Sequence, residues 1–255
     1  MTRTWRLVDD VGRDLTAAEQ MAADVVLLDD VARGAEPALR LYTWRQPTLT
    51  LGRFQPRDDV DENACAHLGV DVVARPTGGR ALLHGADVTY AVAMPRPEGR
   101  AGTVAELYER LAAVLVAALA DLGVDAAVAH GEGRAGAACF AAAQGADLRV
   151  RGRKLCGSAQ LQRDGCVLQH GSLRCEPLPV TEADVLRFED DRARAAVRER
   201  LAASTVTLAE LGAPHDVATV ASALTSAFAR TLDVTWRSSV GVEGIAKSRA
   251  VVVHG

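Results

Sequence analysis

Apolar residues recur with the spacing of a helix in three long stretches of this chain. Two of these stretches begin with a capping box, Thr16 with Glu19 and Thr103 with Glu106, in which each side chain bonds the other residue's backbone N–H. Gly123 follows the second stretch, and glycine commonly ends a helix. We therefore predict helices over residues 16–31, 103–122 and 216–232.

Other segments alternate apolar and polar residues, or concentrate β-branched residues, as strands do. A turn at residues 45–47 predicts that the segments 38–44 and 48–52 form a hairpin with one half-buried face. Turns near Gly152 and at 163–165 predict a second antiparallel group. The predicted strands cover residues 4–8, 38–44, 48–52, 70–74, 88–94, 126–129, 148–162 and 166–170, and a short helix at 60–68 is predicted to end at Gly69.

Antiparallel hairpins with helices between groups of strands indicate an α+β fold, not a doubly wound parallel sheet. We expect a mixed, mostly antiparallel sheet with packed helices. The sequence shows no internal repeat and no low-complexity linker. It predicts a single domain over residues 1–255, with a core at about 4–175 and a helical part at about 181–255 that packs on the sheet.

Charge and hydropathy exclude several classes of partner. The chain has 29 basic and 33 acidic residues and a net charge of −4, so no general positive field is available to hold nucleic acid. Charges interrupt every apolar run before it could span a bilayer, and residues 1–6 begin no stretch of signal-peptide type. We expect a cytoplasmic protein that binds neither nucleic acid nor a membrane.

The cysteines indicate reduced thiols. An odd number of cysteines without export signals does not suit a disulfide framework. The spacings also lack the close pair of a zinc knuckle, and we expect no metal site. The five cysteines are Cys65, Cys139, Cys156, Cys166 and Cys175.

Lysine is nearly absent: 27 of the 29 basic residues are arginine, and only Lys154 and Lys247 remain. Arginine keeps its proton at any accessible pH, whereas a partly buried lysine can lose it. Lys154, in a segment rich in arginine, is therefore a candidate for proton transfer. Chance survival of two lysines is the competing interpretation.

Cys139 lies in an irregular segment rich in glycine and alanine, at residues 131–145, and an exposed loop suits a nucleophilic thiol. Lys154 on the following hairpin could act on that thiol as its base. Cys156 shares a strand face with Lys154 in a regular strand and is the second candidate, although a packed small side chain is the more ordinary role. The motif G-x-G-x-x-G at 131–136 lacks the crossover helix of a dinucleotide site, so we interpret it as a loop.

Two further features suit ligand binding. The adjacent Gly78 and Gly79, in a loop at residues 75–80, can present backbone amides to a carboxylate, phosphate or thioester oxygen, or can simply form a tight turn. Three arginines alternate next to Lys154 and would share one strand face, either as a solvated surface or as a site for an acidic carrier protein or a pantetheine phosphate. These are Arg149, Arg151 and Arg153.

Taken together, short motifs spread over residues 4–175 resemble the biotin/lipoate protein ligase superfamily and, within it, the octanoyltransferases. The resemblance implies the biotin/lipoate ligase-like fold. Residues 39–54 also resemble the second and third strands of that family. The motifs comprise residues 75–80, His84, Thr89, Tyr90, Cys139, Phe140, 152–154, 157–160 and 169–172.

The resemblance implies an acyl relay without ATP, cofactor or metal. Cys139 would take an octanoyl group from octanoyl-acyl carrier protein, and Lys154 would act as acid and base while the group moves to a lysine of the glycine cleavage H protein or another lipoyl domain. Amides near Gly78 and Gly79 would stabilise the oxyanion. The expected substrate-binding residues are Arg75, Thr77, Gly78, Gly79, Arg80, His84, Gly157, Ser158, Ala159 and His170.

Three alternatives stay open at this point. An ATP-dependent lipoate–protein ligase shares the fold and the Gly-Gly loop but needs no cysteine. An amidotransferase would move the acyl group between lipoyl-domain proteins with a similar cysteine. A carrier-binding module without activity is the non-enzymatic alternative.

Overall fold

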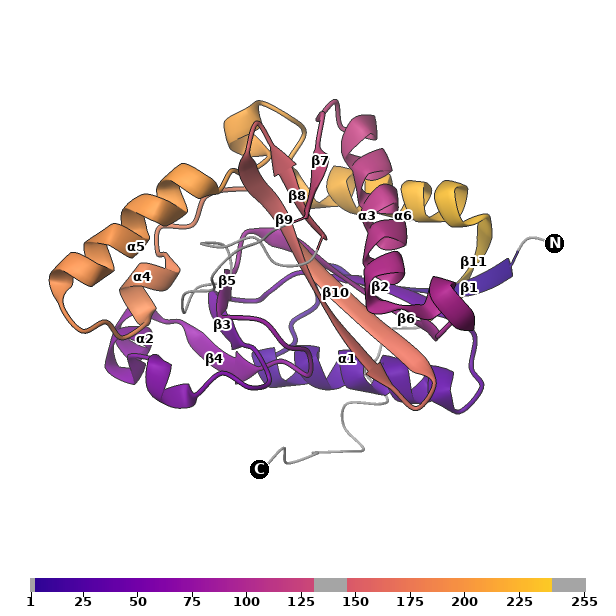
Figure 1. The fold of residues 1–255 in the computed structure, drawn as a ribbon, viewed down its shortest axis with the longest axis horizontal. Helices are drawn as coiled ribbons and strands as arrows, with labels where there is room; N and C mark the ends of the chain where they lie inside the picture. The colour runs from indigo at the N-terminus through magenta and orange to yellow at the C-terminus, as the bar shows by residue number, and fades with distance from the viewer. Residues whose placement is uncertain (1–2, 131–145, 240–255) are drawn as a thin grey trace.

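A computed structural model describes residues 3–130 and 146–239 (Figure 1). Cys139 and Lys247 lie outside these residues. Eight strands form one sheet in the order β11-β1-β2-β6-β10-β9-β8-β7, and three form a second sheet in the order β4-β3-β5. The strands are β1 (Arg3–Asp10), β2 (Ala38–Tyr42), β3 (Thr48–Leu51), β4 (Asp71–Ala74), β5 (Leu82–His84), β6 (Asp87–Pro95), β7 (Ala127–His130), β8 (Ala146–Val150), β9 (Arg153–Arg163), β10 (Cys166–Arg174) and β11 (Val234–Ser239).

The large sheet is mixed and mostly antiparallel. From β2 through β6, β10, β9 and β8 to β7 every pair is antiparallel, and β1 pairs in parallel with both β2 and β11. Strand β11 has no counterpart among the predicted strands. The predicted α+β class is confirmed.

Helices cover both faces of the large sheet. In Figure 1, α1 (Ala17–Ala32) lies below the sheet, and α3 (Val104–Asp121) and α6 (Val217–Leu232) lie together on its other side. Leu39 and Leu41 of β2 belong to the core with α3 and α6, whereas Ala38 and Tyr42 belong to the core with α1. Side chains therefore alternate between two buried faces, as the pleat of a strand requires.

The three predicted long helices are confirmed, and their first residues explain where they begin. Thr16 makes the expected capping box with Glu19, and the Thr103 side chain accepts a bond from the N–H of Glu106. Asp216 caps α6 in the same way through the N–H of Thr219. Local side-chain chemistry thus sets the start of each helix.

The predicted hairpin of residues 38–44 and 48–52 is wrong. Strand β2 lies between β1 and β6 in the large sheet, whereas β3 pairs with β4 and β5 in the small one. Both strands are buried along their whole length, so each is surrounded by neighbours that sequence alternation cannot identify. The turn between them carries the chain from one sheet to the other.

The three arginines after β7 do not share a strand face, contrary to the prediction. Arg149 belongs to β8, and Arg153 to β9. Arg151 lies in the turn between them with a positive φ of 50°. Arg149 donates to the Gly152 carbonyl and Arg153 to the Thr205 carbonyl, so their guanidinium groups stabilise the hairpin and its neighbour.

The small sheet has its own apolar core, shared with short helices. These are α2 (Glu62–Leu68), α4 (Glu182–Val185) and α5 (Asp191–Ser204), drawn at the left of Figure 1. The predicted end of the second helix is confirmed, because Gly69 adopts the left-handed conformation with φ 66°. Across the described residues, no helix is long and apolar enough to cross a membrane.

Candidate functional site

One pocket opens where the small sheet meets the middle of the large one. It holds about 390 Å³, part of it open to solvent. Six of the ten predicted substrate-binding residues line it, although their role stays a prediction. These are Arg75, His84, Gly157, Ser158, Ala159 and His170, and the other lining residues are Met21, Tyr42, Trp44, Thr50, Leu82, Thr89, Gly171 and Ser172.

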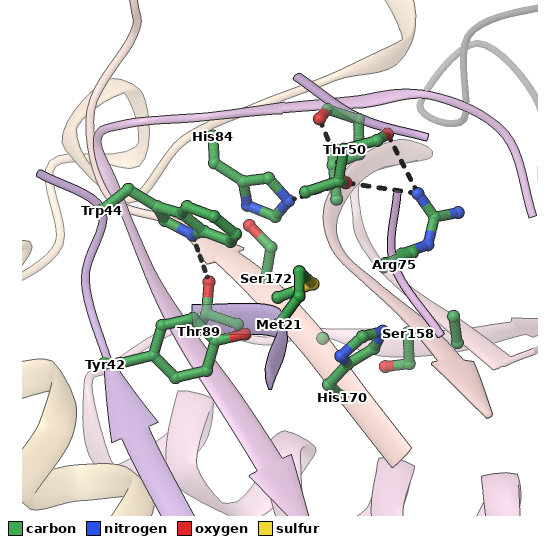
Figure 2. Close-up of a pocket in the computed structure, with 14 residues that line it drawn as sticks. Met21, Tyr42, Trp44, Thr50, Arg75, His84, Thr89, Ser158, His170 and Ser172 are labelled. Carbon is green, nitrogen blue, oxygen red and sulfur yellow. Dashed lines mark hydrogen bonds between the residues drawn. The ribbon is translucent and has the colours of Figure 1, made fainter. Parts of the chain in front are cut away.

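His84 forms one side of the pocket (Figure 2). Its Nδ1 lies 2.9 Å from Oδ2 of Asp87, and its Nε2 lies 3.1 Å from Oγ1 of Thr50. Because an ionised carboxylate can only accept, Nδ1 of His84 donates this bond. The Trp44 ring stacks on the imidazole at 4.4 Å between centroids, which fixes the plane of the histidine.

Asp87 holds several groups on this side of the pocket in place. Besides His84, its carboxylate accepts bonds from the hydroxyls of Thr89 and Ser172 and from the N–H of Gly85. Burial by itself raises the pKa of Asp87, but the interactions with His84, Ser172 and Gly85 act the other way and outweigh it. The pKa of the Asp87 carboxyl therefore lies below its usual value.

His170 repeats the arrangement on another wall of the pocket. Its Nδ1 lies 2.9 Å from Oδ2 of Asp24, and its Nε2 lies 2.7 Å from Oγ1 of Thr77. Each histidine therefore bridges a buried aspartate and a threonine hydroxyl. Through Thr77, His170 is joined to the loop that carries the two glycines.

Asp24 comes from α1 and belongs to a buried polar network. It accepts bonds from Arg40 at 2.8 Å and from the hydroxyl of Tyr42 at 3.1 Å. Burial raises the pKa of Asp24, and the bonds from His170 and Arg40 outweigh this effect, so its pKa lies below the usual value. Arg40 is itself fully buried and also bonds Asp10 at 2.7 Å. This ionic network holds the histidine from beneath the sheet.

The loop at residues 75–80 is held in shape by its own arginine. The guanidinium of Arg75 donates to the carbonyls of Gly78 and Arg80 at 2.7 and 2.8 Å, and to the carbonyl of Thr50 at 3.1 Å. Through these bonds, the Arg75 side chain fixes the conformation of the loop at the edge of the pocket. Thr77, Gly78, Gly79 and Arg80 do not line the pocket themselves.

Gly52 lets this loop pass close to the end of β3. A Cβ on Gly52 would lie 2.1 Å from the carbonyl oxygen of Gly79, a distance that real atoms do not adopt. Gly79 itself has a φ of 97°, which glycine adopts without strain. The two glycines at 52 and 79 therefore serve backbone packing as well as any ligand.

Lys154 lies behind the wall of the pocket and is fully buried. Its Nζ is 3.0 Å from Oδ1 of Asp147, which is 1% exposed. A Cβ on Gly157, a lining residue, would lie 2.9 Å from the same Nζ, so only the missing side chain of Gly157 lets the amine approach this point. Lys154 does not line the pocket itself, but its amine lies directly beside Gly157, which does.

The thiols in the described part of the chain are buried. Burial raises the pKa of Cys156 to about 12, and that of Cys175 also to about 12. Cys156 packs in the core with α3 and α6 and does not line the pocket. A thiol so far from ionisation is a poor nucleophile, so the structure does not favour Cys156, the second candidate of the sequence.

Three carboxylates of the site were not predicted from the sequence: Asp24, Asp87 and Asp147. One of them carried a signal, because Asp24 interrupts the apolar face of the first predicted helix, where a buried charge needs a partner. The other two lie at strand starts and look like ordinary surface residues in the sequence. In the described ranges, no cluster of His, Cys, Asp and Glu side chains could hold a metal ion.

The family described as lipoyl protein ligase A/B catalytic domain matches residues 16–229. The chain belongs to this family. It is 40% identical over 242 residues to a protein named Octanoyltransferase LipM from Kyrpidia tusciae, covering 90% of this chain and 88% of the relative. An Octanoyltransferase LipM from Symbiobacterium thermophilum is 37% identical, with 92% and 89% covered.

Solved structures confirm the fold. A bipartite lipoate protein ligase from Thermoplasma acidophilum, studied with its E2 lipoyl domain, superposes with a TM-score of 0.79 at 20% identity, covering 97% of this chain and 91% of that one. A lipoate-protein ligase A bound with ATP gives 0.77 at 20% identity, covering 97% and 94%. The predicted biotin/lipoate ligase-like architecture is correct.

Proposed function

We propose that this protein is an octanoyltransferase of lipoate biosynthesis. It moves an octanoyl group from acyl carrier protein to a lysine of a lipoyl domain, such as that of the glycine cleavage H protein. The observation that carries the proposal is the match, at 37–40% identity over about nine-tenths of the chain, to relatives named as octanoyltransferases. The ligase structures are similar at only 20% identity and support the fold alone.

The proposed chemistry is two acyl transfers through Cys139. The Sγ atom of Cys139 attacks the thioester carbonyl, a new S–C bond forms, and the S–C bond to the carrier breaks as its thiol takes up a proton. An acceptor lysine amine then attacks the acyl-cysteine, forming an amide and returning the thiol. Both thioesters have similar energy, so the first transfer needs no ATP.

Lys154 is proposed to move the protons of both steps. It would take the proton of the Cys139 thiol, pass it to the leaving carrier thiol, and then assist the incoming amine. Its position supports this role, because its amino group lies at Gly157 on the wall of the pocket. A buried cation there would also stabilise a thiolate or an oxyanion.

The pocket is proposed to hold the octanoyl chain. Met21, Trp44 and Leu82 give it an apolar lining, and the histidines beside them are held by their carboxylates. The amides of Gly78 and Gly79 are proposed to donate to the thioester oxygen at its edge. Neither ATP nor a metal enters this scheme.

Intact mass spectrometry tests the proposal. The full-length protein is incubated with octanoyl-acyl carrier protein in the absence of ATP, and an octanoyl adduct is expected on the enzyme. The adduct should be absent in Cys139→Ala and retained in Cys156→Ala, a matched control with a buried thiol. Adding apo H protein should then discharge it.

Other outcomes identify the alternatives. A ligase would modify an apo lipoyl domain only when free lipoate and ATP are supplied. An amidotransferase would form the adduct from octanoyl-H protein and not from the carrier protein. A protein that binds the carrier without any adduct would be a binding module, and each of these results would overturn the proposal.

A further inference from the structure

Lys154 and Asp147 form an ion pair that is almost completely removed from solvent. The two charged atoms are 3.0 Å apart, and their side chains are 0% and 1% exposed. Taking two charges out of water costs free energy, and an apolar pair of similar volume is often as stable or more stable. Stability alone therefore gives no reason for this pair.

An irregularity in β9 determines where the amine points. Leu148 pairs with Cys156, and Arg149 pairs with Lys154, so Leu155 is one extra residue on β9 between the two pairs. In a regular strand, residues three apart face opposite sides. An extra residue of this kind changes the direction of the side chains that follow it. Here Leu155 allows Lys154 and Gly157 to face the same side, and the amine of Lys154 lies next to Gly157.

Asp147 and Gly157 constrain the amine together. The Oδ1 atom of Asp147 lies 3.7 Å from the place where a Cβ on Gly157 would stand, and Nζ of Lys154 lies 2.9 Å from it. The carboxylate therefore attracts the amine to this place, and the glycine leaves the space that it occupies. Gly157 lines the pocket, so this space borders the substrate site.

We propose that Asp147 is a positioning residue for the transfer reaction: its buried carboxylate holds the amino group of Lys154 at the pocket wall, in the space left by Gly157. The inference rests on the proposed function, because it assigns to Lys154 the proton transfers described above. Asp147 does not touch the acyl group. It acts through the place and the protonation of the amine.

The test compares Asp147→Asn with Asp147→Glu in the full-length protein. The rate of octanoyl-adduct formation is measured by intact mass at several concentrations of octanoyl-acyl carrier protein. In Asp147→Asn, the maximal rate is expected to fall on the order of 10²-fold, because small displacements of a reacting group have effects of this size. The half-saturating carrier concentration of Asp147→Asn should stay within about twofold of the wild-type value. Asp147→Glu restores the charge, and its maximal rate should be about tenfold higher than that of Asp147→Asn.

Gly157→Ala and Asp30→Asn complete the design. Gly157→Ala keeps both charges but places a methyl group where the amine lies, so it should slow adduct formation without a change in charge. Asp30, half-buried and paired with Arg6 and Arg33 on the outside of α1, is the control carboxylate, and its variant should keep the wild-type rate. Thermal unfolding of every variant shows which are folded.

The outcomes separate this inference from the proposed function. If Asp147→Asn folds and keeps the wild-type maximal rate of adduct formation, the positioning role is overturned. It is also overturned if Asp147→Asn and Asp147→Glu lose the same fraction of that rate. If Asp147→Asn does not fold, a wild-type rate in Gly157→Ala overturns it instead. Absence of an adduct in the wild-type protein contradicts the proposed function itself.

Discussion

The two sides of the pocket hold their ionisable groups differently. On the histidine side, His84 and His170 each lie between an aspartate and a threonine hydroxyl, and each aspartate has further donors. On the lysine side, Lys154 is held in a direct ion pair with Asp147, beside a glycine. The histidine side is thus a network in which each carboxylate has several partners, whereas on the lysine side two opposite charges, 0% and 1% exposed, face each other directly. The loss of one group should therefore have a larger effect on the lysine side.

The largest effect on stability is expected for Lys154→Met. This change leaves the buried charge of Asp147 without its ion-pair partner, and breaking a buried pair costs about 3–5 kcal/mol of unfolding free energy. The double variant Asp147→Leu with Lys154→Met should recover most of that loss, because it removes both buried charges. Urea unfolding at pH 7 measures both values, and a double variant no more stable than the single one would contradict this view of the lysine side.

His170→Ala is expected to cost less, about 1–3 kcal/mol of unfolding free energy. Asp24 loses one partner but keeps Arg40 and Tyr42, so its charge stays compensated. The hydroxyl of Thr77 loses the hydrogen bond that joins it to β10. The same urea titration measures the difference from Lys154→Met, and equal losses would show that the two sides do not differ.

Acid should lower the unfolding free energy by protonating the two aspartates of the histidine side. The pKa values of Asp24 and Asp87 are lowered in the folded protein below their usual value of 3.8. Their contribution to stability is present above that value and is lost as the pH falls below it toward the folded pKa values. The unfolding free energy of Asp87→Asn should therefore fall less steeply with acid than that of the wild type, measured by urea unfolding between about pH 5 and about pH 2. A steeper fall would contradict the assigned direction.

The smallest effect is expected for Trp44→Phe, about 0.5–1.5 kcal/mol. The variant keeps an aromatic ring next to His84 but loses the bond from Nε1 of Trp44 to the hydroxyl of Thr89, which is 2.9 Å long. Thr89 still donates to Asp87. Chemical denaturation followed by circular dichroism measures the change, and a loss as large as that of His170→Ala would make the Trp44 bond a main support of the network.

Local signals in the sequence predicted much of the fold. The capping box at Thr16, the side-chain cap at Thr103, the end of a helix at Gly69 and the turn around Gly152 depend on a few adjacent residues, and each is found in the structure. The short motifs also predicted six of the fourteen residues that line the pocket, because members of a family share the spatial arrangement of their motifs.

Contacts between distant segments could not be predicted in this way. The separation of β2 and β3 into different sheets depends on neighbours that fold against both edges of each strand. The pairing of β11 with β1 joins residues more than two hundred positions apart. The partners of the two histidines come from different elements in the same way, since Asp24 lies 146 residues from His170.

The sequence by itself determined most of the secondary elements, the family and several residues of the site, because these follow from periodicity, caps and short motifs. Only the tertiary structure decided which carboxylate holds Lys154 and which holds each histidine. Asp147 reaches Lys154 through an extra residue in β9, and Asp87 reaches His84 through a turn at Gly85. The physical reason is that the charge state of a buried group depends on partners within a few ångströms in space, and the order of residues along the chain does not specify those distances.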